Sequence, residues 1–251
     1  ITVGISIWNK EDLIPSLIRG LHENLDPEDE IILLFDHCTD NSFNVASECL
    51  AELKRNDVVS LVYDDGPDLF EIKANNLILQ QAKNDVIALF QDDIVLEDSR
   101  FKSKIFQVIN KIGLKDLGLM GGRSGFELGS NLSFPERPLY KVSNWEHLKS
   151  QYGLRTPSGS FAVKTFLNRG PLVFTRELIN DVGLLDEIYY PQWGDDMDYC
   201  AKAKFIKKRK NIVFECKVRS DLEWGGTRKK DSKLRHGTHF KRNWAIFTGK
   251  W

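Results

Sequence analysis

The chain has 251 residues, of which 41% are hydrophobic and 28% are charged, so it is an ordinary globular protein with room for one large domain or two small ones. No run of about 18 apolar residues occurs, and the sequence therefore predicts no membrane-spanning helix. The net charge of −1 conceals an asymmetry, because residues 202–251 hold 16 Lys and Arg against 4 Asp and Glu.

This basic C-terminal segment has two interpretations. A run of charge is usually a solvated face. It can also attract a phosphorylated donor or anionic lipid headgroups, which would bring the protein to a membrane as a peripheral component. The four cysteines have no metal-site spacing, so we expect free thiols and a cytoplasmic protein. We expect no nucleic-acid partner.

The first 115 residues or so alternate between strand and helix patterns. The apolar residues of the opening segment alternate with small or polar ones, which predicts a buried strand rather than a signal peptide. Three further strands and four helices follow in alternation. The predicted strands are 1–7, 31–35, 58–63 and 86–90, and the helices cover 13–21, 45–53, 74–82 and 101–112.

The second half is less regular. Residues 121–170 are rich in Gly, Ser, Pro and aromatics, which predicts long loops with short elements around a binding site. A strand at 172–174, a helix at 176–182, a helix from Asp196 to about Lys208 and a strand at 212–214 follow. The alternation predicts an α/β fold with a mostly parallel central sheet flanked by helices. We expect one domain, 1–251, with a Rossmann-like nucleotide half at 1–120 and an acceptor and catalytic half at 121–251.

Asp92 and Asp93 directly follow the strand at 86–90. In a parallel sheet, ligands bind beyond the carboxyl ends of the strands. Hard divalent cations such as Mn²⁺ or Mg²⁺ prefer carboxylate oxygens and leave positions open for phosphate oxygens. The alternative is an ordinary turn or helix cap at a strand end, where Asp is common.

Two other acidic segments are candidates. Asp36 and Asp40 follow the second strand and could bind a base edge or a ribose, or form an Asx turn before a capped helix. Asp195, Asp196 and Asp198 lie at a predicted helix start, where acidic residues suit the helix dipole. Because one cap needs only one carboxylate, a general base for an acceptor hydroxyl is the other interpretation.

Six segments, in order, resemble those of inverting family-2-type glycosyltransferases with a GT-A fold. They include an opening strand and turn, a nucleotide loop, a loose D-x-D metal motif and an acidic catalytic motif. The segments are ISIWNKEDLIPSLIRGL (5–21), FDHCTDNSFNVA (35–46), ALFQDDIVLED (88–98), LNRGPLVFTRELINDVGLLDE (167–187), WGDDMDYCAKAK (193–204) and RNWAIFTGKW (242–251).

The resemblance implies roles for individual residues. It places Asp93 as the ligand of Mn²⁺ or Mg²⁺, Asp92 beside the ribose and phosphates, and Asp196 as the catalytic base with Asp195 beside it. The nucleotide would lie against the loops after the first two strands, with contacts from Trp8, Asn9, Asp36 and Asp40. The implied reaction moves a sugar, with inversion, from a nucleotide diphosphate sugar to a hydroxyl of a glycan or a lipid-linked acceptor.

The sequence departs from the family pattern in two places. The common Pro of the first turn is replaced by Ile7-Trp8. The His that often precedes a GG-S/T stretch is absent from Leu222–Thr227. His236 or His239 could substitute for it at the metal site, although a lone His is more often a structural or surface residue. The Q-x-x-R-W signature of processive synthases is missing. Further cations for the leaving group would come from Arg228, Lys229, Lys230 and Lys241, and sugar-stacking aromatics from Phe126, Phe134, Tyr140, Trp145 and Tyr152.

Three other functions stay open on the sequence. A sugar-phosphate nucleotidyltransferase would use a similar sheet, but it usually opens with a Gly-rich phosphate loop where this chain has Trp8-Asn9-Lys10. A carbohydrate- or nucleotide-binding protein could keep the fold without turnover. A two-metal hydrolase would need more His ligands than the spacing supplies.

Overall fold

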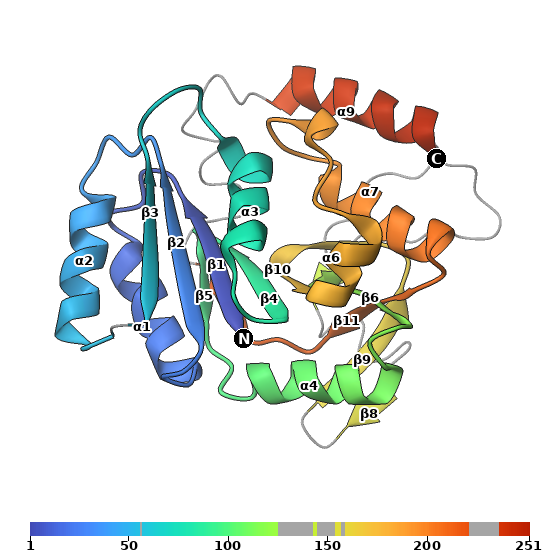
Figure 1. Ribbon diagram of the computed structural model, residues 1–251, viewed down its shortest axis with the longest axis horizontal. Coiled ribbons are helices and arrows are strands. Elements are labelled where there is room, and N and C mark those ends of the chain that lie inside the picture. The colour runs from blue at the N-terminus through green and yellow to red at the C-terminus, as the bar shows by residue number, and fades with distance from the viewer. Residues whose placement is uncertain (56, 125–142, 145–153, 157–158, 221–235) are drawn as a thin grey trace.

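The computed structural model describes residues 1–251 except 56, 125–142, 145–153, 157–158 and 221–235. The alternating elements predicted for the first half are all present (Figure 1). They are β1 (Thr2–Ile7), α1 (Ile14–Asn24), β2 (Glu30–Asp36), α2 (Ser42–Glu52), β3 (Val58–Tyr63), α3 (Phe70–Gln81), β4 (Val86–Gln91), the short β5 (Ile94–Leu96) and α4 (Phe101–Ile112).

The second half contains more strand than the sequence predicted. The strand expected at 172–174 is the end of a longer β10 (Leu167–Thr175), and the segment expected to be loops also contributes β9. The other elements are β6 (Leu117–Ser124), β7 (Ser143–Asn144), β8 (Leu154–Thr156), β9 (Gly159–Lys164), α6 (Arg176–Val182), η1 (Glu187–Tyr189), α7 (Asp195–Ala201), η2 (Lys202–Ile206), β11 (Lys210–Phe214), β12 (Val218–Ser220) and α9 (His236–Lys250).

One sheet runs through the molecule in the order β3-β2-β1-β4-β10-β6-β11-β9-β8, with β7 paired to β6. Strands β1 to β4 are parallel, and β10 runs antiparallel to both β4 and β6. The α/β class is therefore confirmed. Because β10 is antiparallel to β4, its beginning lies beside the carboxyl end of β4, where the predicted site begins.

Helices cover both faces of the sheet. Apolar side chains of α1, α2 and α4 form a buried cluster with one face, and those of α3, α6 and α7 form a second cluster with the other. Residues of β1 alternate between the two faces, as the period of an extended strand requires. No helix in the described ranges is both long enough and apolar enough to cross a membrane.

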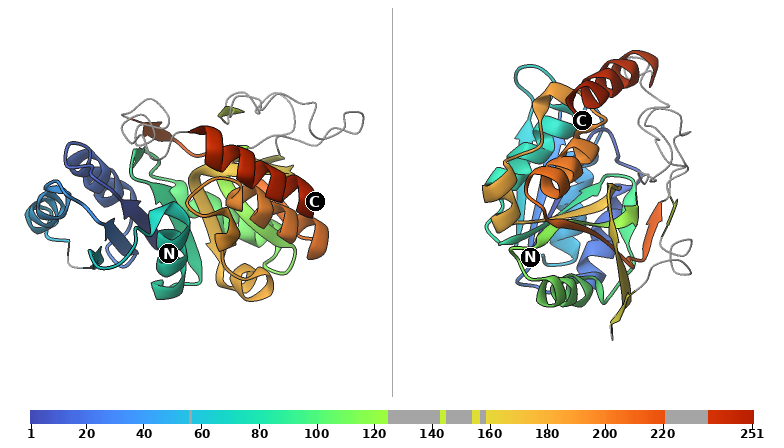
Figure 2. Two further views of the ribbon diagram at one scale, coloured as in Figure 1. Left: turned by 90° about the horizontal axis from the view of Figure 1, so that it is seen from above. Right: turned by 90° about the vertical axis from the view of Figure 1, so that its right-hand side faces the viewer.

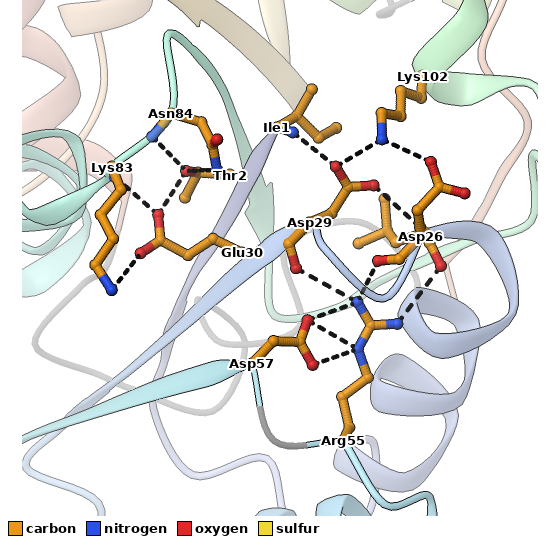
Figure 3. Close-up of polar contacts among 11 residues, drawn as sticks. Ile1, Thr2, Asp26, Asp29, Glu30, Arg55, Asp57, Lys83, Asn84 and Lys102 are labelled. Carbon is orange, nitrogen blue, oxygen red and sulfur yellow. Dashed lines mark hydrogen bonds and ion pairs between the residues drawn. The ribbon is translucent and has the colours of Figure 1, made fainter.

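Polar contacts hold the amino-terminal ends of the parallel strands, opposite the ends that carry the predicted site. The Thr2 hydroxyl donates to Glu30, and Lys102 pairs with Asp29, while the buried Arg55 pairs with Asp57 and donates to the carbonyl of Asp26 (Figure 3). These contacts fix the beginnings of neighbouring strands relative to one another. The opposite ends are left for the loops that carry the candidate site.

Helix α9 packs on the second half of the chain. Figure 2 shows it across the surface beside α7. The Asn243 side chain donates to the carbonyls of Tyr189, Gln192 and Trp193, and Trp193 packs on Phe240 with ring centroids 4.1 Å apart. The C-terminal helix therefore braces the segment that leads into α7.

Candidate functional site

The loops after β1, β2 and β4 are joined by side-chain hydrogen bonds. The Trp8 amide donates to Asp92 Oδ2 at 3.2 Å, and Asn9 Oδ1 accepts from the Thr39 amide at 2.7 Å. Asn9 has a φ of 51°, a left-handed conformation that Asn tolerates better than most residues. The parallel strands thus bring three of the predicted loops to one edge of the sheet.

Asp92 and Asp93 form the two-residue connection between β4 and β5. The Asp92 carboxylate accepts the Trp8 amide and lies 3.2 Å from the Lys10 ammonium, which is itself buried. Burial raises the pKa of Asp92 to about 6, against the opposing effect of Lys10. Asp92 therefore ties the loop after β4 to the loop after β1.

Asp93 is 8% exposed, and its Oδ1 has no hydrogen-bond partner among the described residues. Burial raises the pKa of Asp93, while Lys10 and Arg123 act in the opposite direction. A buried carboxylate oxygen without a partner is costly. Coordination of a hard cation would satisfy it, so this oxygen has the chemistry of one ligand of a divalent metal ion.

The carboxylates of Asp36 and Asp40 are bound to backbone amides. Asp36 accepts from the amides of Leu69 and Phe70 at 3.1 and 2.9 Å, and from His37 at 2.9 Å. Asp40 accepts from the Ser42 amide two residues on and from the Glu11 amide. Burial acts to raise the pKa of Asp40, but these bonds and the Ser42 side chain together outweigh it and lower the pKa. The Asx-turn alternative therefore describes Asp40, and Asp36 orders the loop before α3.

Three carboxylates at the start of α7 have different environments. Asp195 and Asp198 are both 0% exposed, whereas Asp196 is partly exposed. Asp198 accepts from the Tyr189 hydroxyl and the Trp251 indole and pairs with Lys202 and Lys250. Of the three, only Asp196 is partly exposed to solvent.

The helix is preceded by two residues in the left-handed region. Trp193 has a φ of 80°, and Gly194, the N-cap of α7, has a φ of 96°. A Cβ on Gly194 would lie 2.9 Å from the Tyr189 ring, so the position has no room for a side chain. This turn sets the direction in which the first turn of α7 leaves. The helix predicted to run to about Lys208 ends at Ala201 and continues as a π-helical turn over Lys202–Ile206.

Arg169 on β10 joins the two acidic regions, a contact that no sequence pattern indicated. Its guanidinium pairs with Asp195 of α7 and with Glu71 in the first turn of α3. Glu71 in turn accepts from Gln91 at 3.4 Å, the residue before Asp92. Arg169, Glu71 and Gln91 also line a small cavity with Asn75 beneath the sheet edge.

Both proposed histidine ligands belong to α9. His239 lies half-buried on α9, and the side chain of His236 lies outside the described residues. No group of three or more His, Cys, Asp or Glu side chains arranged to hold a metal occurs among the described residues. Also outside them are Leu222–Thr227, Arg228, Lys229, Lys230 and the aromatics Phe126, Phe134, Tyr140, Trp145 and Tyr152.

The arrangement offers two chemical functions at one edge of the sheet. Asp93 presents a buried acceptor to a cation, and Asp196 presents an accessible carboxylate that could take a proton. The turn that carries Asp93 is connected to the loop after β1 through the contacts of Asp92 with Lys10 and Trp8.

Comparison with known protein families gives one match for this chain. Residues 2–117 match the sequence model of glycosyl transferase family 2. No curated protein sequence matches the chain significantly.

Solved structures share the fold at low sequence identity. The mannosyltransferase PcManGT from Pyrobaculum calidifontis, in complex with GDP-Man and Mn²⁺, is 12% identical with a TM-score of 0.64 over 99% of this chain and 64% of its own. GalNAc-T7 with UDP, GalNAc and Mn²⁺ is 14% identical with a TM-score of 0.72 over 100% of this chain and 47% of its own. Residues 1–349 of S. aureus TarS are 13% identical with a TM-score of 0.58 over 99% of this chain and 78% of their own.

The chain thus spans less than two thirds of the length of the first two of these proteins. The family match contains the first three of the six segments and supports the resemblance to family-2-type glycosyltransferases, and the solved structures share the GT-A fold.

Proposed function

We propose that this chain, a family-2-type glycosyltransferase by the match of its first half and by its GT-A fold, moves a sugar from a nucleotide diphosphate donor to an acceptor hydroxyl with inversion. In this proposal residues 1–120 bind the nucleotide and residues 121–251 bind the acceptor and supply the base. The acceptor is a glycan or a lipid-linked molecule.

The observation that carries the proposal is the difference between two carboxylates whose neighbours in the chain are joined through Glu71 and Arg169. Asp93 keeps a buried oxygen without a hydrogen-bond partner in the described structure, and Asp196 stays accessible while its neighbours are buried. Glu71 and Arg169 join the two regions through direct contacts. A donor-binding group and a base held near each other are what a transfer reaction requires.

Asp93 would hold the divalent cation, Mn²⁺ or Mg²⁺, with Asp92 beside the ribose and phosphates of the donor. When bound, the cation supplies Lewis-acid stabilisation of the charge that develops on the leaving diphosphate. The presence of Mn²⁺ in the PcManGT and GalNAc-T7 structures supports this assignment. His239 and His236 remain proposals for a further ligand.

Asp196 would accept the proton of the acceptor hydroxyl as its oxygen attacks the anomeric carbon. The bond from that carbon to the diphosphate oxygen breaks on the opposite side, so the configuration inverts. One Asp196 oxygen accepts the amide of Met197 at 2.8 Å, which fixes the orientation of the carboxylate. Trp8, Asn9 and Asp36 would surround the nucleotide, with Asp40 ordering the loop.

The basic C-terminal segment fits either the donor or an anionic membrane surface. In the described part of this segment, Lys241, Arg242 and Lys250 are exposed on α9. Positive charge there would raise the local concentration of phosphorylated donors or of lipid-linked acceptors at a membrane. If the acceptor is lipid-linked, we propose that this segment contacts the membrane surface peripherally.

The test is release of nucleoside diphosphate from a panel of nucleotide sugars with Mn²⁺ and candidate acceptors. We expect Asp196→Asn to retain donor binding and to lose at least about 100-fold in turnover, the scale of general base catalysis. Asp181→Asn, whose carboxylate pairs with Lys207 and Arg209 at the surface, is the matched control and should transfer normally.

Other outcomes separate the alternatives. Pyrophosphate release from a sugar phosphate and a nucleoside triphosphate would indicate a nucleotidyltransferase. A ligand-dependent rise in melting temperature without turnover for any donor would indicate a binding protein of the same fold. Wild-type turnover by Asp196→Asn would place the base elsewhere.

A further inference from the structure

Arg169 is a buried cation between three elements of the fold. It is 8% exposed and lies near the beginning of β10, next to the irregular register between β10 and β6. Its backbone is held as well, because its amide donates to Asn168 Oδ1 and its carbonyl accepts from Arg123. The side chain is therefore presented from a fixed strand position.

The two carboxylates that Arg169 binds belong to different parts of the candidate site. Glu71 lies in the first turn of α3 and accepts from Gln91, which directly precedes Asp92 and Asp93. Asp195 lies in the first turn of α7 and directly precedes Asp196. One guanidinium thus spans from the donor side of the site to the helix that carries the proposed base.

The chemistry of the contact favours a positioning role. A guanidinium presents a planar fork of five N–H donors and can bind two carboxylates at once, whereas an ammonium is a single point charge. Asp195 is fully buried, so without Arg169 its charge would have no cation in the described structure to offset it. Relief of that buried charge would require the first turn of α7 to move or Asp195 to take a proton.

We propose that Arg169 is a positioning residue, which fixes the first turn of α7 against the end of β4 so that Asp196 faces the donor held at Asp92 and Asp93. The inference rests on the proposed function and adds a residue to it. Arg169 acts through Glu71 and Asp195 and does not itself touch the reacting atoms.

The first experiment compares Arg169→Met with Arg209→Met by steady-state kinetics. Arg209 is also buried, at 7% exposed, and is bound to Asp181 and to the carbonyls of Leu114 and Leu117. We expect Arg169→Met to lower kcat by about 100-fold, with donor KM changed less than about threefold, because a small misplacement of a catalytic group has this scale of effect. Arg209→Met should lower stability by a similar amount and leave kcat near the wild-type value.

Two further variants, Arg169→Lys and Glu71→Gln, test the contact itself if Arg169→Met fails to fold. Arg169→Lys retains the charge but not the fork and should recover only part of the lost kcat. Glu71→Gln should lower kcat in the same direction, and its effect should not add to that of Arg169→Met, because the two residues share one contact. Additive effects, or a normal kcat in Arg169→Met, would overturn the inference.

Hydrogen exchange separates this inference from the proposed function. The Asp198 amide donates to the Gly194 carbonyl at 2.9 Å in the first turn of α7. Its exchange should become at least about tenfold faster in Arg169→Met and stay unchanged in Arg209→Met. If no donor is turned over, the proposed function fails while this measurement still reports on α7. Unchanged exchange in Arg169→Met refutes the positioning role itself.

Discussion

The ammonium of Lys10 lies 3.2 Å from the carboxylate of Asp92, so a buried cation already occupies part of the acidic turn. Lys10 is held in place from both sides, because its amide donates to the Ser42 hydroxyl at 2.7 Å and its ammonium approaches the Trp8 carbonyl at 3.5 Å. The turn is therefore less negative than its two aspartates suggest. A divalent cation must bind against the field of this lysine.

Replacement of Lys10 tests this competition. Two unit charges about 4 Å apart interact by about 4 kcal/mol at an effective dielectric constant of about 20, so Lys10→Met should raise the affinity for Mn²⁺ in the absence of nucleotide by at least about tenfold. Titration calorimetry measures the change. Lys102→Met, at the opposite edge of the sheet, is the matched control (Figure 3). Unchanged Mn²⁺ affinity in Lys10→Met would show that the lysine does not compete.

Asp93→Asn keeps the shape of the side chain and removes its charge. We expect loss of Mn²⁺-dependent donor binding, with no loss of stability, because the buried carboxylate is costly in the absence of the ion. Calorimetric titration of donor with and without Mn²⁺ checks the first part, and thermal unfolding checks the second. Asp116→Asn, a 65% exposed carboxylate, should behave as wild type in both. Donor binding that keeps its Mn²⁺ dependence would refute the metal assignment.

The affinity for Mn²⁺ should depend on pH through the acidic turn. Burial raises the pKa of Asp92 to about 6 and also raises that of Asp93. The proposed ligand Asp93 binds a cation only when it is deprotonated, and protonation of the neighbouring Asp92 removes a negative charge beside the cation. We expect the dissociation constant to increase by about tenfold per unit as the pH falls below about 6, and to level off above about pH 7. A flat profile between about pH 5 and pH 8 contradicts the assignment.

Replacement of Arg55 tests how much the contacts at the amino-terminal ends of the strands contribute to stability. Its guanidinium pairs with Asp57 at 2.9 Å and donates to the carbonyl of Asp26 at 2.9 Å (Figure 3). Arg55→Met should lower the free energy of unfolding by about 2–3 kcal/mol, the scale of lost hydrogen bonds to a charged group. Urea unfolding gives the value, and nucleotide-sugar turnover at low temperature should be unchanged. A turnover loss without a stability loss would show that this edge communicates with the site.

The sequence by itself determined the first half of the fold. Strands such as β2 are continuous apolar runs, and helices such as α1 repeat apolar residues at helical spacing, so both are fixed by local periodicity. The same periodicity placed Asp92 and Asp93 directly after β4. It failed at β9 and at the beginning of β10, where Gly, Pro and polar residues interrupt the pattern and strand pairing across the sheet decides the structure.

Only the tertiary structure decided what each acidic side chain does. Residue type and spacing do not separate the three aspartates at the start of α7, and only the family resemblance singled out Asp196. In the structure, Asp198 is held by Tyr189, Lys202 and Trp251, and Asp195 is held by Arg169. Asp196 is partly exposed to solvent. The cost of burying a charge depends on groups brought from distant parts of the chain, and local sequence spacing carries no information about them.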